Sequence, residues 1–496
     1  MATRTISNAG GNYNTTGAWV EGIVPTSADD VVATVTSGNL TINVASNCKS
    51  INFTNYTNTL TATSTLTVSG SVTLVSAMTI SGTGTLIVDS TSTLTSNGKT
   101  WTGSLTFQNT VTHTLADAWI VSGNLLVGIA AQGPTINGFS ISVGGSLSST
   151  SVGSAFGTAN VILNGTGTWS WSSGWCFFPI TINTVGTITI SNVSIGANFV
   201  HVAGIVVTTG STLRLSAATY SITSNTIIWN NVILGTTTSF TTTLNDDLNI
   251  NGNLTIGANF NTQTVNGNNI NLSGSLSSSA GTTNLTGTTV LNFVGTGTWS
   301  GTSTIKSNVN INTAGTLTIS GTVTYDTRTL KRIAGTVVTT GSTLNITNTA
   351  TLDTNGITWN NVTLAAGTQT LNSLLTVNGT LSLGTVFNVT FAGTSGFTCA
   401  NLSCVAAGRL ITFQAAQTYT ITNSLIITGT IPSKVSLTST STGALFNLQY
   451  GATQNVQNCN ATFINSSGGQ TIYTSAGTLS NTVNWSVGSG NFFLLF

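Results

Sequence analysis

The chain has 496 residues, of which 4% are charged, and its formal net charge at pH 7 is +1. This balance excludes the basic surface that nucleic-acid binding requires, and the abundance of Thr, Ser, Asn, Gly and aliphatic residues is typical of strands. No apolar run reaches the roughly 18 to 20 residues that span a bilayer, so we expect an all-β protein without membrane insertion.

The first segment, residues 1–36, differs in texture from the rest of the chain. It contains the single glutamate, Glu21, together with Pro25 and the acidic pair Asp29 and Asp30. We expect an end cap or an attachment segment here, because a coil of stacked strands has open ends that must be covered. The start, MATRTISNAGGNYN, lacks the apolar core of a signal peptide, which predicts synthesis in the cytoplasm.

A long repeat dominates residues 37–395. The phrase AGIVVTTGSTLRLS at 203–216 returns as AGTVVTTGSTLNIT at 334–347, and further phrase pairs keep the same offset of 129 to 131 residues. Within this repeat, turn-like phrases of small residues recur about every 21 residues and separate short runs of Val, Ile, Leu and Thr. The short period predicts a parallel β-helix with about 21 residues per turn, in which a block of six turns is duplicated.

Such a coil would be an elongated rod, on the order of 110 Å long if about 23 turns stack at ~4.8 Å. Inward Leu, Ile and Val would form the core, and stacked Asn side chains would bond along the rod. The general geometry of parallel crossovers favours a right-handed coil. Five tryptophans keep the repeat frame and are expected in core or corner packing, with an exposed aromatic stripe as the alternative: Trp101, Trp169, Trp229, Trp299 and Trp359.

One aromatic segment departs from its own repeat. TWSWSSGWCFFP at 168–179 corresponds to TWSGTSTIKSNV at 298–309 in the other repeat copy. Four aromatic residues therefore occur where that copy has none: Trp171, Trp175, Phe177 and Phe178. Aromatic side chains that the fold can spare are typical of contacts with sugar rings or with another subunit. A locally larger core or corner is the alternative, and the sequence leaves both open.

Charged residues gather in one compact group, which comprises Asp326, Arg328, Lys331 and Arg332. The group lies in the longest interval between turn phrases, where an enlarged loop would project from the coil. Three cations on one loop could hold an anionic sugar, so the sequence makes this group a second candidate binding site.

Catalytic residues are scarce. Glycoside hydrolysis needs two carboxylates about 5 to 9.5 Å apart. Asp117 and Asp246 are repeat equivalents, so about six turns separate them. The adjacent Asp246 and Asp247 would point to opposite faces of a strand, which favours a turn role. His113 and His201 are isolated in sequence, and we expect no enzyme activity, no cofactor and no metal site.

The cysteines are odd in number and contain no CxxC pair: Cys48, Cys176, Cys399, Cys404 and Cys459. This pattern favours small buried apolar residues over a disulfide framework or a zinc site. Cys399 and Cys404 are the one pair that would form a bridge if any does.

The long repeat fades in residues 396–496, which we expect to form the last turns of the coil and an apolar end cap. The chain closes with five apolar residues: Phe492, Phe493, Leu494, Leu495 and Phe496. They are expected to plug the last turn or to dock into a partner or a second copy.

Segments near both ends carry a resemblance to a known group. WVEGIVPTSADDVV at 19–32, followed by GNLTINVASNCKSINF at 38–53, resembles the start of Thr/Ser/Gly-rich β-helical proteins of tailed phages and of secreted bacterial surface proteins. SSGGQTIYTSAGTLSNTVNWSV at 466–487 resembles their final turns. Secreted relatives carry a signal peptide before the first motif, so its absence here favours the phage version, assembled in the host cytoplasm.

The resemblance implies a non-enzymatic virion protein, a fibre, spike or surface-appendage subunit that forms a rigid rod. Its partners would be other virion proteins, two further copies in a homotrimer, or glycan of the host surface. A glycan-binding adhesin, extracellular or at the cell surface, is the main alternative, and a polysaccharide depolymerase is the third.

Overall fold

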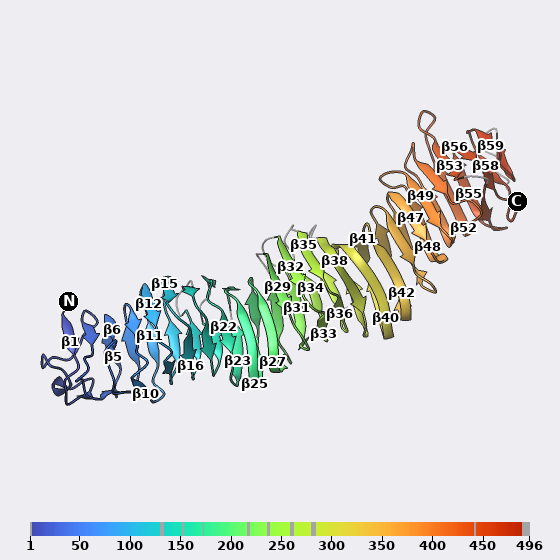
Figure 1. Cartoon of the computed structure of the whole chain (residues 1–496). Coiled ribbons are helices and arrows are strands. Elements are labelled where there is room, and N and C mark those ends of the chain that lie inside the picture. Colours follow the sequence, from blue (N-terminus) through green and yellow to red (C-terminus); the bar gives the residue numbers. More distant parts are fainter. Residues whose placement is uncertain are drawn as a thin grey trace. The chain divides into compact units, whose positions relative to one another are not determined.

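The computed structural model describes residues 2–128, 133–150, 153–171, 173–215, 219–235, 239–257, 262–278, 284–440 and 443–488. Strands make up nearly all of the regular structure in these ranges, beside the 3₁₀ turn η1 (Thr16–Ala18). The chain forms two compact units, Met1–Ile233 with Phe240–Leu248 and Leu234–Ser239 with Asn249–Phe496. Both units are parallel β-helices, which confirms the predicted fold class (Figure 1).

Each turn of the first unit contributes three strands, and most strands pair in parallel with the strand three places further along the chain. β14 (Leu105–Phe107), for example, lies between β11 (Leu86–Val88) and β17 (Leu125–Val127). The first residues of these strands are paired and lie 19 and 20 residues apart, close to the predicted period of about 21.

The other strands of the first unit are β1 (Thr3–Thr5), β2 (Gly11–Asn12), β3 (Asp30–Val32), β4 (Leu40–Ile42), β5 (Ser46–Cys48), β6 (Ser50–Asn52), β7 (Thr59–Ala62), β8 (Leu66–Val68), β9 (Val72–Thr73), β10 (Thr79–Ser81), β12 (Ser92–Thr95), β13 (Thr100–Trp101), β15 (Thr112–Leu115), β16 (Trp119–Val121), β18 (Thr135–Gly138), β19 (Ile141–Val143), β20 (Leu147–Ser149), β21 (Ala155–Gly157), β22 (Val161–Leu163), β23 (Gly167–Trp171), β24 (Cys176–Phe177), β25 (Ile180–Ile190), β26 (Val193–Ile195), β27 (Phe199–Val207), β28 (Thr212–Leu215), β29 (Thr219–Thr223), β30 (Ile228–Trp229) and β32 (Phe240–Leu244). The division between the units falls within β31 (Asn231–Leu234) and β33 (Leu248–Ile250).

The second unit contains β34 (Leu254–Ile256), β35 (Thr262–Gly267), β36 (Ile270–Leu272), β37 (Leu276–Ser278), β38 (Asn284–Phe293), β39 (Gly297–Ser300), β40 (Thr304–Ser320), β41 (Thr322–Tyr325), β42 (Thr329–Val338), β43 (Thr343–Ile346), β44 (Ala350–Asp353), β45 (Thr358–Trp359), β46 (Asn361–Leu364), β47 (Gly367–Leu371), β48 (Leu375–Leu383), β49 (Val389–Gly393), β50 (Phe397–Cys404), β51 (Leu410–Phe413), β52 (Thr418–Thr428), β53 (Val435–Ser439), β54 (Ala444–Leu448), β55 (Thr453–Gln457), β56 (Cys459–Thr462), β57 (Ile464–Asn465), β58 (Ile472–Thr474), β59 (Leu479–Ser480) and β60 (Trp485–Val487). Several of these strands, such as β40, are long enough to turn from one face of the coil to the next and pair on both.

The core of the first unit is a column of similar side chains. Leu66, Leu86, Leu105, Leu125 and Leu147 pair in register from turn to turn, and each is at most 1% exposed. Neighbouring residues on a strand point to opposite faces. The residue that follows each of these leucines therefore points outward, and it is partly exposed or lies at the edge of the core. The five frame tryptophans are at most 2% exposed, which confirms core packing over an exposed aromatic stripe.

The predicted duplication is visible in backbone detail. β25 and β40 both shift register against the next turn around one asparagine, Asn183 in the first unit and Asn312 in the second. The TTGS phrases that follow make the same turn, closed by a Ser211 amide bond to the Thr208 carbonyl at 2.9 Å and by its sister from Ser342 to Thr339 at 3.0 Å. A duplicated sequence therefore gives a duplicated backbone, bulges included.

A ladder of amide side chains ties four turns of the second unit together. Asn271 donates to Asn249 at 2.9 Å, Asn292 to Asn271 at 2.8 Å, and Asn310 to Asn292 at 3.0 Å. The same column continues into Lys331, which pairs in register with Asn310. The predicted stacking of asparagines along the coil is thus confirmed in this unit.

The first strand, β1, has its outer edge covered by residues 18–21. The Glu21 carboxylate accepts the Thr5 amide at 2.9 Å, Val20 donates to the Thr5 carbonyl at 2.8 Å, and Ser7 donates to Ala18 at 2.8 Å. Below this cover, Trp19 is 2% exposed. The single glutamate of the chain therefore closes a strand edge that would otherwise be open to another chain.

Replacing Glu21 with alanine is expected to expose the Thr5 amide, to cost about 1 kcal/mol of unfolding free energy, and to promote self-association at that edge. Glu21→Gln keeps an acceptor oxygen and is the matched control. Light scattering after size exclusion and urea unfolding would measure both effects. A monomeric Glu21→Ala protein with wild-type stability would show that the edge is protected by the remaining contacts.

The predicted domain boundaries at 36/37 and 395/396 do not coincide with the division into units, which falls between residues 233 and 249. β1 and β3 already pair within the expected cap segment. At the other boundary, β47, β49 and β51 stack without interruption. Strand stacking thus begins before residue 37 and continues past residue 395, while residues 18–21 cover the edge of β1.

Candidate functional site

The aromatic segment 168–179 is divided between the core and the surface. Trp171 and Phe178 are each 1% exposed and pack edge to face, with ring centroids 5.8 Å apart. Trp175 and Phe177 are partly exposed. The alternation of side chains accounts for this division. Cys176 and Phe178 point inward, whereas Phe177 points outward, and Trp175 lies just before them. Only Trp175 and Phe177 of the four predicted residues can meet a ligand without unpacking the core.

A further exposed ring joins Phe177. Phe156, on β21 one turn earlier, pairs in register with Phe177, and their rings stack at 4.9 Å with 5° between the planes. Phe156 is 49% exposed. Phe156 was not among the predicted residues. The sequence does carry a signal for it, because AFG at 155–157 corresponds to LTG at 285–287 in the other repeat copy.

The predicted group of cations does not form one site. Lys331 pairs with Asp353 at 3.8 Å, whereas Asp326 pairs with Lys306 at 3.4 Å. Arg328 Nε donates to the Lys306 carbonyl at 3.3 Å. Each charge has an ionic or backbone partner, and these partners lie on different turns, so the side chains do not converge on a common anion.

Arg332 is engaged with the backbone. Its Nη2 donates to the Gly335 carbonyl at 2.6 Å and its Nη1 to the Asn355 carbonyl at 2.6 Å. In the first unit the sister residue His201 contacts the carbonyls of Gly204 and Ser224, both at 3.2 Å. Both side chains therefore stabilise the bulged strand and the next turn, which leaves Arg332 little freedom to bind an anionic sugar.

The outward column that holds Phe156 and Phe177 in the first unit has an equivalent column in the second unit. In the second unit Thr286 pairs in register with Lys306, whose ammonium binds Asp326 on the following turn. In the first unit the corresponding positions hold Phe156 and Phe177. The same outward column thus carries two stacked aromatic rings in the first unit and a lysine that forms an ion pair in the second unit.

The two repeat-equivalent aspartates have the same structural role. Asp117 accepts the amides of Ser96 and Asn97, at 2.7 and 2.5 Å, and Asp246 accepts those of Ser224 and Asn225. Both asparagines adopt positive φ, 48° and 53°. The carboxylates hold a left-handed corner of the preceding turn, as expected for a turn role.

His113 lies inside the first unit, fully buried against the Phe107 ring at 4.6 Å between centroids. Its Nδ1 contacts the Ser92 hydroxyl at 2.8 Å, and Nε2 lies 3.5 Å from the Gln108 carbonyl. Burial lowers the pKa of His113 to about 4, and the Gln108 carbonyl and the Asp89 carboxylate oppose this shift only in part. With no access to solvent, this serine and histidine do not form a hydrolytic site.

His113 makes the first unit sensitive to acid. Its native pKa of about 4 lies below the ordinary histidine pKa of 6.5, so the unfolded state binds the proton more tightly. The stabilisation is therefore complete above about pH 6.5 and is lost as the pH falls toward 4, with a limit of about 3 kcal/mol. Urea unfolding between pH 7.5 and 4.5 would measure it. His113→Asn should flatten this dependence, and an equally steep dependence in the variant would contradict it.

All five cysteines are free and buried, which confirms their prediction as small core residues and leaves Cys399 and Cys404 unbridged. Burial raises the pKa of the Cys176 and Cys399 thiols to about 12. The apolar residues 492–496 lie outside the described residues.

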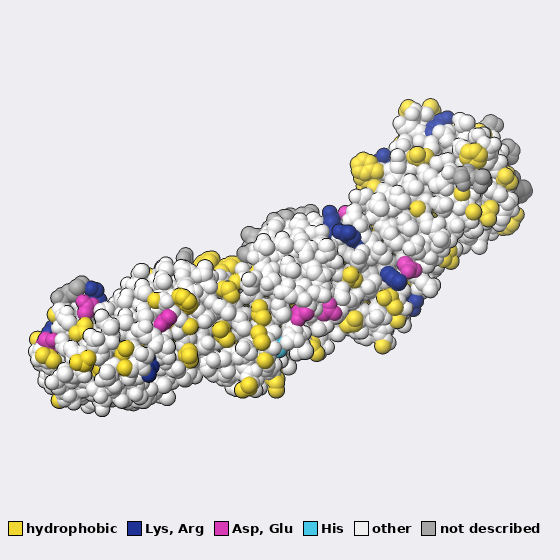
Figure 2. Space-filling view, in the orientation of Figure 1, with side chains coloured by type: hydrophobic (Ala, Val, Ile, Leu, Met, Phe, Trp, Pro, Cys, Tyr) yellow, Lys and Arg dark blue, Asp and Glu magenta, His cyan; other side chains and the backbone are white. Residues whose placement is uncertain are grey.

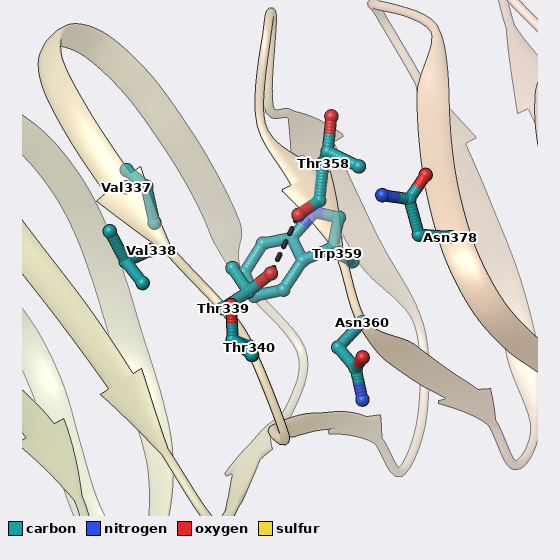
Figure 3. A pocket seen from close by; sticks show the side chains of 8 residues that line it. All are labelled: Val337, Val338, Thr339, Thr340, Thr358, Trp359, Asn360 and Asn378. Carbon is teal, nitrogen blue, oxygen red and sulfur yellow. Dashed lines mark hydrogen bonds between the residues drawn. The ribbon is translucent and has the colours of Figure 1, made fainter.

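A shallow pocket of about 250 Å³ lies beside the TTGS turn of the second unit (Figure 3). The Thr339 hydroxyl donates across it to the Thr358 carbonyl at 2.6 Å. Its lining is Val337, Val338, Thr339, Thr340, Thr358, Trp359, Asn360 and Asn378. These side chains contain no acid or base that titrates near neutral pH, so the pocket offers hydroxyl and amide contacts but no proton transfer.

Within the described ranges, no group of three or more His, Cys, Asp and Glu side chains could hold a metal ion. The helical structure there is also too short and too polar to cross a bilayer. Comparison with protein-family models, curated proteins and solved structures found no match.

Proposed function

We propose that this chain is a non-enzymatic structural protein of a tailed-phage virion, a fibre, spike or surface-appendage subunit. The observation that carries the proposal is the use of polar and charged side chains to join one turn to the next. A coil built this way resists local unfolding, because each turn pairs its backbone with the turns on both sides.

The acidic residues support a scaffold role. Acidic side chains bond to backbone amides, to a hydroxyl, or to a lysine or arginine of the same unit: Glu21, Asp29, Asp30, Asp117, Asp246, Asp326 and Asp353. These carboxylates serve as hydrogen-bond acceptors and ion-pair partners within the coil. The described carboxylates therefore fit stacking better than catalysis.

The surface supports the same role. Charged side chains are sparse on the face that Figure 2 shows, and most of the atoms there belong to uncharged polar residues or the backbone. Such a surface suits dense packing beside copies of itself and other virion proteins, since it creates little charge repulsion. The assignment to a virion rests on the sequence resemblance to phage β-helical proteins. On this proposal the chain assembles in the host cytoplasm, with a homotrimer as one arrangement.

Mass spectrometry of purified particles tests the proposal. The chain should be found in particles after a gradient and a protease wash, at a fixed copy number relative to the major capsid protein. Host proteins of similar abundance in the lysate are the control for contamination. If the chain is absent from washed particles, or if its amount varies like that of the host proteins, the virion assignment is wrong.

A further inference from the structure

The exposed rings of the first unit form a defined surface feature. Phe156 and Phe177 stack one turn apart at 4.9 Å, and Phe156 is 49% exposed. Trp175 lies two residues before Phe177, directly before β24, and is also partly exposed. We call these three residues the aromatic platform.

The coil does not need the aromatic platform. At the register positions of Phe156 and Phe177 the second unit carries Thr286 and Lys306, with the same pairing to the neighbouring turn. Exposed phenylalanine rings are disfavoured in water, so their presence in one copy and absence from the other points to a contact that the first unit makes.

The charge around the aromatic platform is zero. No Asp, Glu, Lys or Arg occurs between Asp117 and Arg214. Hydroxyl and amide groups stand beside the rings instead, because Thr135 pairs in register with Phe156. Further along the same two turns, Thr181 exchanges hydrogen bonds with Asn160, at 3.1 and 3.2 Å. A ligand complementary to this surface is neutral, with an apolar face and many hydroxyl groups.

The area of the aromatic platform argues for a small ligand. Three partly exposed aromatic side chains, each burying about 150 to 250 Å² at most, offer less than the roughly 800 Å² per partner of a stable protein interface. A sugar ring is of the right size, since the C–H face of a pyranose covers one or two aromatic rings. Its hydroxyl groups can then meet threonine and asparagine at the edge.

We propose that the aromatic platform binds a pyranose ring of a neutral oligosaccharide. This inference goes beyond the structural role proposed above and does not depend on it. The rings supply the stacking contact, and the absence of charge makes the binding insensitive to salt.

Titration of the full chain with maltohexaose, cellohexaose, chitohexaose and a mannose hexamer tests the proposal, by saturation-transfer NMR and tryptophan fluorescence. The decisive variant combines Phe156→Thr with Phe177→Lys, the residues that the second unit carries at these positions. We expect saturable binding of at least one probe by the wild type and at least about tenfold weaker binding by this variant. Its unfolding midpoint should be unchanged, because the same backbone accepts these residues in the second unit.

Thr286→Ala, at the equivalent position of the second unit, is the matched control and should bind like the wild type. The proposal is overturned if no probe saturates the wild type at millimolar concentration, or if the Phe156→Thr, Phe177→Lys variant binds as well as the wild type. A change of oligomeric state in that variant, without any glycan binding by the wild type, would also overturn it and assign the rings to a subunit contact.

Discussion

Gly103→Ala is expected to destabilise the first unit by about 3 kcal/mol, the upper end of the usual cost of overpacking a core. A Cβ atom on Gly103 would lie 1.9 Å from the Gly84 carbonyl oxygen, too close for any side chain. Because the contact is with backbone on the neighbouring turn, relief requires the turns to separate and their ladder bonds to stretch. Urea unfolding followed by circular dichroism would measure the loss.

Gly103 is one member of a glycine column. The Cβ of Gly123 would lie 2.7 Å from the Gly103 carbonyl oxygen, and that of Gly145 would lie 2.8 Å from the Gly123 carbonyl oxygen. Gly17→Ala is the matched control, since no heavy atom lies within 4 Å of its Cβ position, and it should change stability by less than about 0.5 kcal/mol. Equal effects of the two substitutions would show that turn spacing does not depend on the glycines.

Trp171→Ala is expected to cost about 3 to 5 kcal/mol of unfolding free energy, the usual loss for a buried tryptophan. Its indole is 1% exposed and packs against the Phe178 ring, so its removal leaves a cavity in the core. Trp175→Ala, four residues later in the same segment, should cost less than Trp171→Ala because the Trp175 side chain is partly exposed.

Both variants can be compared by thermal and urea unfolding of the full chain. The order of the two losses in unfolding free energy matters more than their size, because it distinguishes the buried residues of the segment from its partly exposed residues. A Trp175→Ala protein as unstable as Trp171→Ala would contradict the outward orientation of Trp175. It would also remove Trp175 from the aromatic platform.

The fold could be predicted from sequence because its signals are local and periodic. Alternation of apolar and small polar residues specifies strands, and a period of about 21 residues specifies stacking of one turn on the next. The inward leucine column and the asparagine ladder follow directly from these two signals. The offset of 129 to 131 residues predicted the duplicated block, and the structure adds that both copies carry the same register shift, at Asn183 and Asn312.

The candidate site was harder to predict, because exposure depends on the phase of a strand and not on its composition. Trp171 lies two residues after Trp169 on β23, so it shares the inward phase of that core residue. Trp175 directly precedes the next strand, β24, on which the Phe177 side chain points outward. Assigning one role to the whole segment therefore combined two core residues with two surface residues.

Two different side chains occupy one position of the repeat, His201 in the first unit and Arg332 in the second, and neither is free to vary. His201 is 4% exposed, and both side chains hold carbonyl groups of the backbone. The cause is the register shift beside them, which sequence alternation does not reveal. The His201 ring and the Arg332 guanidinium both contact backbone carbonyl groups at the equivalent bulge. The substitution therefore preserves a hydrogen-bonding role.

The Glu21 contact gives the coil a direction. A stack of parallel strands is chemically polar, and its two edges would recruit further strands equally well if both were left open. Here the Thr5 amide of β1 donates to the Glu21 carboxylate, and the Thr5 carbonyl accepts the Val20 amide. Adding a further strand beside β1 would therefore first require the displacement of Glu21 and Val20.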